Sequence, residues 1–575
     1  MIQGMPGKIR NPILRGFHPD PSIVRVGDDY YIATSTFEWY PGVEIHHSRD
    51  LAHWRLVRRP LERATQLNML GDPDSCGIWA PCLSYADGLF YLVYTDVKRY
   101  GRSTAGPGGV PHVRVDNESM SATRGSRADE GVRPTLGVMF RDMHNYVVTC
   151  ASVEGEWSEP VYLNSSGFDP SLFHDERGRK YLVNMVWDHR PGRNRFAGIG
   201  LQEYSAAERR LVGPARVIFE GTALGFTEGP HLYKRGGWYY LLTAEGGTGY
   251  GHAVTLARSR DLQGPYEVHP EGPILTSRDR PELELQRAGH ADLVETQHGE
   301  TYLVHLCGRP LSSLGRCTLG RETAIQKMAW GEDGWLRTAD GRGLPCPEVD
   351  APRLPACVFA AAAAREEFDG EKLAADFQWL RSPWPEELFS LTERPGHLRL
   401  YGRESLGSLF RQALVAQRQQ SHRYTAETVM EFEPESFQQM AGLVCYYSGV
   451  KFHYLYVSHD GELGKHVGVM SCHPDTGQPD LAIAPRAIRA GAAVGLRVEV
   501  DRERLRFGYR VGEEEWQWIG EEFDAGILSD EAPPPGPNFT GAFVGMCCQD
   551  LAGTGKAADF DFFEYREAEE VERRA

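Results

Sequence analysis

The sequence lacks several features that mark common protein classes. Its 575 residues contain no run of about 18 apolar residues, so no transmembrane helix is expected. The first 20 residues have no apolar core of the kind that a secretory signal peptide needs. The eleven cysteines form no CxxC pair, which argues against a zinc site and predicts reduced thiols in a cytoplasmic protein. A net charge of −17 argues against nucleic acid or an anionic membrane as partner.

The length of the chain and its aromatic content indicate the number of domains and the kind of ligand. A chain of 575 residues is too long for one ordinary hydrophobic core, so we expect two or more domains. Aromatic residues make up 11% of the chain. Aromatic rings beside carboxylates are typical of sites for neutral sugars, because the rings stack on C–H faces while polar groups bind the hydroxyls.

Five segments in the first 340 residues share one pattern. Each runs through a short apolar stretch, turns at a Gly- or Asp-rich tip and returns through aromatic and β-branched residues, which predicts a β-hairpin. The segments are 20–35, 80–95, 169–184, 228–243 and 289–304.

A second pair of strands is expected after each hairpin, for example in 43–57, 252–268 and 323–338. Four strands that recur about every 60 residues are typical of the blades of a β-propeller, and five copies predict five blades. The second copy is too long. Its excess, residues 99–141, is rich in Gly, Arg and Ser and is interpreted as a long surface loop.

Asp20 lies between two prolines in "FHPDPSIV". Proline restricts its own φ and the residue before it, so Asp20 is expected to be extended, either in an ordinary turn or as a preorganised catalytic base. The first strand of each blade lines the channel of a propeller. Asp20, Asp169 and Glu228 therefore occupy equivalent places in blades 1, 3 and 4, with His290 in blade 5. Like charges in such a cluster raise one another's pKa values, which costs stability, so a cluster of this kind indicates a functional site.

The rest of the chain predicts a second all-β domain. Residues 341–366 are rich in proline and alanine and resemble a linker, so the propeller is assigned to 1–340. Short alternating segments with turn residues between them predict a jelly-roll-like β-sandwich over 367–567. The last residues, 568–575, form a charged tail. The fold class is therefore all-β, a five-bladed β-propeller followed by a β-sandwich.

Long motifs in this sequence resemble glycoside hydrolase family 43, in its intracellular β-xylosidase branch. They include "NPILRGFHPDPSIVRVGDDYYIATSTFEWYPGVEIHHSRDL", "GIWAP", "NSSGFDPSLFHDE", "TEGPHLY" and "LGRETAIQK". The resemblance covers nearly the whole chain and implies an inverting enzyme. It implies Asp20 as general base, Glu228 as general acid, and Asp169 as the residue that raises the pKa of the acid and orients it. In an inverting glycosidase the acid and the base stand roughly 6.5–9.5 Å apart.

The same resemblance implies contacts to the sugar. Phe37 and Trp79 would flank the nonreducing xylose, Arg321 would bond its hydroxyls, and His290 would lie beneath it on the channel axis. Phe539, from the second domain, would close the pocket. Further candidates for the pocket lining are Thr248, Trp187 and His144. The resemblance implies no required cofactor. In parts of the wider family the histidine equivalent to His290 helps hold a calcium ion or a water cluster, and branch members are often homo-tetramers or homo-dimers.

The leading hypothesis is an exo-acting β-xylosidase that trims xylo-oligosaccharides inside the cell. The runner-up is an α-L-arabinofuranosidase, or a protein with both activities, because arabinofuranose and xylopyranose can present similar hydroxyls to one pocket. A carbohydrate-binding propeller without catalysis is disfavoured because all three carboxylates are present. A retaining enzyme is disfavoured because it needs its two carboxylates closer together.

Overall fold

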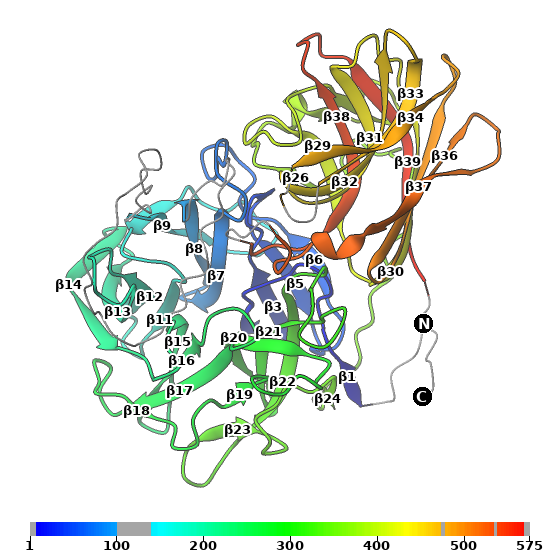
Figure 1. Cartoon of the computed structure of the whole chain (residues 1–575). Coiled ribbons are helices and arrows are strands. Elements are labelled where there is room, and N and C mark those ends of the chain that lie inside the picture. The colour runs from blue at the N-terminus through cyan, green and yellow to red at the C-terminus, as the bar shows by residue number, and fades with distance from the viewer. Residues whose placement is uncertain (1–6, 101–139, 473–475, 477, 534–537, 569–575) are drawn as a thin grey trace, which may run out of the picture.

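The structure, a computed structural model, describes residues 7–100, 140–472, 476, 478–533 and 538–568. In these ranges the only helical elements are two short 3₁₀ turns, η1 (Pro385–Glu387) and η2 (Ala525–Ile527). No helix in the described part is long and apolar enough to cross a membrane. Figure 1 shows two β units, one coloured blue to green and the other yellow to red.

The first unit consists of five antiparallel sheets, each formed by four strands in chain order, with one additional strand in the fourth. Blade 1 is β2 (Ser22–Val26), β3 (Asp29–Thr34), β5 (Glu44–Ser48) and β6 (Arg55–Arg58). Blade 2 is β7 (Gly77–Ala86), β8 (Leu89–Arg99), β9 (Asp142–Cys150) and β10 (Val161–Asn164). Blade 3 is β11 (Ser171–His174), β12 (Lys180–Trp187), β13 (Phe196–Ser205) and β14 (Arg210–Phe219). Blade 4 is β15 (Glu228–Arg235), β16 (Trp238–Glu245), β17 (Ala253–Ser259), β18 (Glu267–Val268) and β19 (Leu275–Thr276). Blade 5 is β20 (Gln286–Glu295), β21 (Thr301–Gly308), β22 (Glu322–Trp330) and β23 (Leu336–Thr338).

The first strands of the blades are neighbours in a closed ring, in the order β2, β7, β11, β15, β20 and back to β2. The predicted five-bladed propeller is therefore confirmed, with the first strand of each blade on the inside. This arrangement explains how residues that lie 60 or more positions apart in the chain meet at one place.

The N-terminal segment runs along blade 5 but adds no strand to the sheet of that blade. Strand β1 (Lys8–Arg10) pairs with β24 (Glu348–Asp350), and the Asn11 side-chain amide donates to the carbonyl oxygens of Ile325 and Cys346. Further along, the His18 N–H donates to the carbonyl oxygen of Arg321 at 3.0 Å. The start of the chain thus brings Asp20 beside Arg321.

The second unit is a sandwich of two large antiparallel sheets. One sheet has the order β27 (Phe389–Ser390), β28 (Leu398–Tyr401), β39 (Ala557–Glu567), β30 (Arg423–Glu431), β35 (Val494–Asp501), β36 (Arg504–Val511) and β37 (Gln517–Asp524), with β25 (Arg365–Glu366) against β39. The other has the order β34 (Pro479–Ala487), β33 (Gly464–Cys472), β32 (Lys451–Asp460), β31 (Gln439–Ser448), β38 (Phe543–Asp550), β29 (Ala413–Arg418), β26 (Gln378–Leu380) and β4 (Trp39–Tyr40). The predicted β-sandwich is confirmed.

One strand of the sandwich comes from the propeller. Strand β4 follows the second strand of blade 1 and pairs with β26, with Tyr40 opposite Trp379. Next to it, the ring of Trp39 stacks on Phe543 with centroids 3.7 Å apart. The segment after β37, orange in Figure 1, reaches back to the propeller. The buried hydrophobic core is therefore continuous between the two units.

Candidate active site

A left-handed backbone conformation recurs where each blade begins. It is found at Asp20 (φ 56°), Ala80 (φ 36°), Asp169 (φ 54°), Gly229 (φ 55°) and His290 (φ 37°). In four of the five blades a proline follows directly. The β-ladder is irregular at these points in blades 2, 4 and 5, as expected for a β-bulge that redirects a side chain.

Two predictions about this repeat are wrong. Asp20 is not extended: aspartate is one of the few residues that tolerate the left-handed region, and the strand entry demands that conformation despite the flanking prolines. In blade 4 the equivalent of Asp20 is Gly229, not Glu228, which lies one residue earlier. The glycine fits because a side chain there would press on the His290 ring, with a Cβ only 3.1 Å from Nδ1.

Asp20 is buried and firmly held. Its Oδ1 accepts a hydrogen bond from Arg321 Nη1 at 2.9 Å, and its Oδ2 accepts one from Ser35 Oγ at 2.7 Å. The Ser35 hydroxyl in turn accepts from the Ala80 N–H at 2.7 Å, which ties blade 1 to blade 2. A charged guanidinium against a buried carboxylate makes a strong, oriented pair. Asp20 is therefore a fixed hydrogen-bond acceptor that could take a proton from water.

Asp169 faces the same space from blade 3. Its Oδ2 accepts a hydrogen bond from the Gly229 N–H at 3.0 Å, directly beside Glu228. Nδ1 of His290 lies 3.9 Å from Asp169 Oδ2 and 3.8 Å from Asp20 Oδ1. Burial and then the Asp20 charge raise the pKa of Asp169 to about 8, against the opposing hydrogen bond from Gly229.

Glu228 is the third carboxyl group, and its side chain stays partly exposed at the start of β15. Desolvation raises the pKa of Glu228 well above its ordinary value, and the charges of Asp169 and Asp20 raise it further. Arg321 opposes these effects. A carboxyl group kept protonated near neutral pH can donate a proton. The cluster thus combines a fixed acceptor with a proton donor.

Aromatic rings form a wall beside the carboxylates. The ring centroids of Phe37 and Trp79 lie 5.5 Å apart, and Phe539 lies 5.4 Å from Trp79 and 6.3 Å from Phe37. The Arg321 guanidinium carbon lies 5.0 Å from the Phe37 centroid and 5.7 Å from the Phe539 centroid. We call Phe37, Trp79 and Phe539 the aromatic wall. The structure brings these predicted site residues together with Asp20 and Arg321.

The sequence reasoning missed Tyr100. Its ring lies 4.9 Å from Trp79 and 6.0 Å from both Phe539 and Trp187, and burial and then the charge of Glu228 raise its pKa. Tyr100 directly follows β8, inside the stretch 99–141 that was interpreted as a surface loop. Strand β8 is apolar from Leu89 to Tyr94 and charged at its end, so the one signal for Tyr100 is an aromatic residue directly after the strand. Residues 101–139 of that stretch lie outside the described residues, as does the tail from 569 onward.

The remaining candidates differ in placement. Thr248 Oγ1 accepts a 3.4 Å hydrogen bond from Arg321 Nη1, and Trp187 reaches the site through Tyr100. His144 instead contacts Ser165 and Tyr162 along the outer strands of blade 2. Burial lowers the pKa of His290 to about 4, so this imidazole is neutral near pH 7.

Calcium does not fit well at His290. Calcium takes six to eight oxygen ligands, whereas the Asp20 carboxylate beside His290 is already compensated by the Arg321 guanidinium. A different cluster, His18, Glu44 and His46, gathers its ligand atoms within 4.8 Å. There, Arg59 and Arg418 both pair with Glu44, and their two charges oppose a divalent cation.

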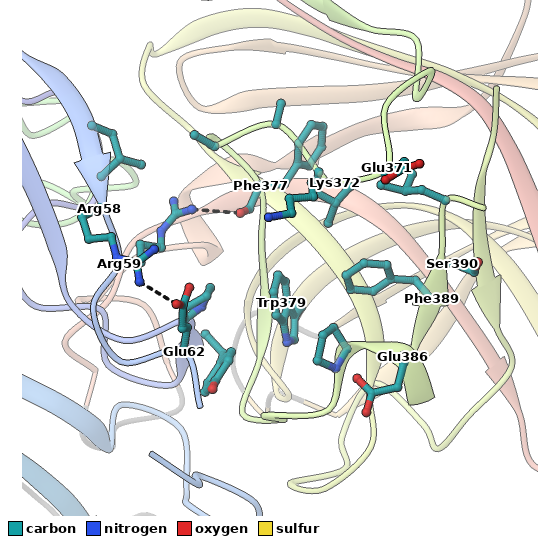
Figure 2. Close-up of a pocket in the computed structure, with 18 of the residues that line it drawn as sticks. Arg58, Arg59, Glu62, Glu371, Lys372, Phe377, Trp379, Glu386, Phe389 and Ser390 are labelled. Carbon is teal, nitrogen blue, oxygen red and sulfur yellow. Dashed lines mark hydrogen bonds and ion pairs between the residues drawn. The ribbon is translucent and has the colours of Figure 1, made fainter. Parts of the chain in front are cut away.

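A separate cavity of about 710 Å³ lies between blade 1 and the sandwich (Figure 2). Arg58, Arg59 and Glu62 form its propeller side, and Phe377, Trp379 and Phe389 face them from the sandwich. None of the predicted site residues lines this cavity. The carboxylate cluster and the aromatic wall are therefore the better candidate for chemistry.

Comparison with protein families identifies both units. Residues 9–336 match the model of "Glycosyl hydrolases family 43". Residues 365–566 match the "Beta xylosidase C-terminal Concanavalin A-like domain". The two matches cover nearly all of the propeller and the sandwich.

Similar proteins cover nearly the whole chain. A "Beta-xylosidase" of Bacillus subtilis (strain 168) is 48% identical over 97% of this chain and 100% of its own. A "Xylosidase/arabinosidase 43B" of Humicola insolens is 50% identical over 97% of this chain and 98% of its own. The crystal structure of a "xylan beta-1,4-xylosidase" from Bacillus halodurans C-125 superimposes with a TM-score of 0.89 at 53% identity, over 97% of this chain and 100% of that one.

Proposed function

The chain belongs to glycosyl hydrolase family 43 and is a glycoside hydrolase, and on that premise we propose that it is an exo-acting, inverting β-xylosidase. Its proposed substrates are β-1,4-xylo-oligosaccharides, from which it releases xylose at the nonreducing end. The names of its relatives support the substrate class.

One observation supports the proposed mechanism above all: a proton donor and a fixed acceptor stand in one site. In the proposed reaction Glu228 gives its proton to the glycosidic oxygen as the bond from that oxygen to the anomeric carbon breaks. A water molecule attacks the opposite face of the same carbon, and Asp20 takes the proton that the water loses. The oxygen of water thus becomes the new hydroxyl of xylose, with inverted configuration.

Asp169 and Arg321 would support these two groups. Asp169 lies beside Glu228 and raises its pKa, which keeps the acid protonated until the leaving oxygen needs it. Arg321 fixes the Asp20 carboxylate and, with Thr248, would bond sugar hydroxyls. His290 is neutral and lies between Asp20 and Asp169, where it would support the floor of the sugar pocket. The carboxylate separation that inversion requires stays a prediction.

The aromatic wall supports exo action. Phe539 comes from the sandwich and stands against Trp79 and Phe37, so the space beside Asp20 is closed on that side. A pocket that is closed behind one sugar accepts a chain end and rejects an internal unit. The expected product is therefore one xylose at a time.

A second candidate function is α-L-arabinofuranosidase activity, alone or together with xylosidase activity. It is favoured by the relative at 50% identity, whose name includes both sugars. The same carboxylates and the same pocket would serve both substrates, since each sugar offers an anomeric carbon and neighbouring hydroxyls to the same donors and acceptors.

We also propose that the protein acts in the cytoplasm as a homo-oligomer. All eleven cysteines are free thiols and ten of them are buried, as suits a reducing compartment. The oligomer rests on the family resemblance alone.

The substrate proposal is tested with xylotriose that carries a fluorescent label at its reducing end. Stepwise release of unlabelled xylose, with labelled xylobiose as the intermediate, is expected. Glu228→Gln keeps the shape of the side chain and is expected to abolish release. A parallel incubation uses 4-nitrophenyl α-L-arabinofuranoside. Release of arabinose but no xylose would move the assignment to the second candidate. Release of labelled xylose together with unlabelled xylobiose in the first step would contradict exo action from the nonreducing end.

A further inference from the structure

Ser75 is hydrogen-bonded to two residues of the aromatic wall, Trp79 and Phe539, and to Glu38, which follows the third. It lies between β6 and β7, is buried, and has a left-handed φ of 62°. Its carbonyl oxygen accepts from the Trp79 indole Nε1 at 3.0 Å, and its Oγ accepts from the Phe539 N–H at 3.1 Å. Its own N–H donates to Glu38 Oε2 at 3.1 Å.

Each of these contacts fixes a different segment. Glu38 directly follows Phe37 and is fully buried, so its carboxyl group anchors the turn that presents the Phe37 ring. The indole bond sets the direction of the Trp79 ring. The bond to Phe539 links the propeller to a loop of the sandwich. One residue thus connects blade 1, blade 2 and the second domain at the sugar pocket.

Residues of the sandwich hold the segment next to Ser75 by hydrogen bonds and an ion pair. Asp74, the preceding residue, accepts from Arg381 Nη2 at 2.5 Å and from the Gly449 N–H at 3.1 Å. Arg381 is fully buried and also donates to the Asp72 carbonyl oxygen and to Gln412 Oε1. A buried cation with complete partners is costly to break, so the backbone of Ser75 is held in place independently of its hydroxyl.

Phe539 has two backbone anchors, and Ser75 supplies one of them. The other is Arg321, whose Nη2 donates to the Phe539 carbonyl oxygen at 2.9 Å while its Nη1 holds Asp20. Loss of the Ser75 hydroxyl would leave Phe539 tethered on one side only. The ring could then move away from Trp79 without disturbing Asp20.

We propose that Ser75 is a positioning residue that holds Phe539 against Trp79 and thereby sets the affinity of the pocket for the terminal sugar. The inference rests on the proposed function for the identity of that sugar. In this proposal the Ser75 hydroxyl links the propeller to the sandwich at the sugar pocket by its hydrogen bond to Phe539. A hydroxyl with only a structural role would affect stability and leave sugar affinity unchanged.

The test compares Ser75→Ala with a matched control, Ser458→Ala. Alanine at 75 keeps Cβ and both backbone bonds and removes only Oγ. Ser458 is also buried, and its hydroxyl donates one hydrogen bond at 2.8 Å, to the Gln439 carbonyl oxygen inside the sandwich. Both variants lose one buried hydrogen bond, but only one of the bonds lies at the pocket.

For Ser75→Ala we expect KM for xylobiose and the inhibition constant of free xylose to rise about fivefold to tenfold, as one lost hydrogen bond implies, with kcat changed less than about threefold. Ser458→Ala is expected to leave both constants unchanged. Hydrogen exchange read by mass spectrometry gives a second measurement without substrate. The Phe539 amide is expected to exchange faster in Ser75→Ala and at the wild-type rate in Ser458→Ala.

The outcomes separate this inference from the proposed function. If wild type releases no pentose but exchange at Phe539 rises in Ser75→Ala, the proposed function fails, and the tether from Ser75 to Phe539 is supported. If wild type releases xylose while Ser75→Ala changes neither KM nor exchange at Phe539, the inference is overturned. A loss of thermal stability equal to that of Ser458→Ala, with unchanged KM, would likewise overturn it.

Discussion

Replacing Asp169 by asparagine is expected to move the basic limb of the pH–rate profile to lower pH. Burial, Asp169 and Asp20 together raise the pKa of Glu228. Asparagine has nearly the same shape and can still accept the hydrogen bond from the Gly229 N–H, but it carries no charge. Removing that charge makes ionised Glu228 less costly, so the acid loses its proton at a lower pH.

The magnitude follows from the coupling of the pair. Desolvation and then the Asp169 charge raise the pKa of Glu228, and for carboxyl groups that interact strongly, by about one pK unit or more, the higher apparent pKa belongs to the pair as a whole. Asp169→Asn is therefore expected to lower the basic limb of kcat/KM by at least about one unit. Above that limb each unit costs about tenfold in activity, which equals about 1.4 kcal/mol.

The assay is kcat/KM for xylobiose from pH 5 to pH 10, with Asp292→Asn as the matched control. Asp292 is also a buried aspartate, on β20, where it holds Ser22 and the Ile23 N–H, and it does not contribute to the pKa of Glu228. Its replacement is expected to leave the limb in place. An unmoved limb in Asp169→Asn, or a limb displaced to higher pH, would refute the assignment of Asp169 as the group that keeps Glu228 protonated.

Three further predictions follow from the same contacts. Arg321→Ala removes the partner of buried Asp20. Because an unpaired buried charge costs about 3–5 kcal/mol, kcat/KM is expected to fall roughly 100-fold or more. A fall of less than tenfold would contradict the role of Arg321 as the group that holds Asp20. Phe539→Ala opens the pocket and is expected to raise the inhibition constant of xylose roughly tenfold or more through lost apolar contact, as measured by competition with a chromogenic xyloside. Burial raises the pKa of Glu38 to about 8, so the stability from its bound proton is full below about pH 4.5 and is lost as pH rises through 8. Glu38→Gln is therefore expected to lose less stability than wild type between pH 5 and pH 8, by roughly 2 kcal/mol or more in urea unfolding; equal losses would contradict the raised pKa.

The propeller and the carboxylates could be predicted from the sequence because both depend on local patterns. Each blade repeats a hairpin of alternating apolar residues around a Gly- or Asp-rich turn, and Asp20 and Asp169 precede prolines at equal places in that repeat. The predicted equivalence of Glu228 with Asp20 was wrong because the repeated position is marked by its left-handed φ. Glycine adopts that conformation as readily as aspartate does, and in blade 4 the residue at this position is Gly229. A match by residue type alone therefore chose the neighbouring carboxyl group.

Contacts between the domains could not be predicted in the same way. Tyr100 was assigned to a loop because composition changes directly after it, whereas its role depends on rings from blades 2 and 3 and from the sandwich. Ser75 carries no local signal, since serine is common between strands. Its hydrogen bond to Phe539 joins residues 464 positions apart and exists only where the Phe539 segment of the sandwich lies against the propeller.

The most direct test of the central claim is the configuration of the first sugar released. Wild-type protein is incubated with 4-nitrophenyl β-D-xyloside, whose leaving group has no anomeric carbon, in a proton NMR spectrometer, and the anomeric signals of xylose are followed before mutarotation mixes them. The account predicts α-xylose first, because water activated by Asp20 attacks the face opposite the leaving oxygen that Glu228 protonates. Initial release of β-xylose would mean retention through a covalent intermediate and would contradict the roles proposed for Asp20 and Glu228.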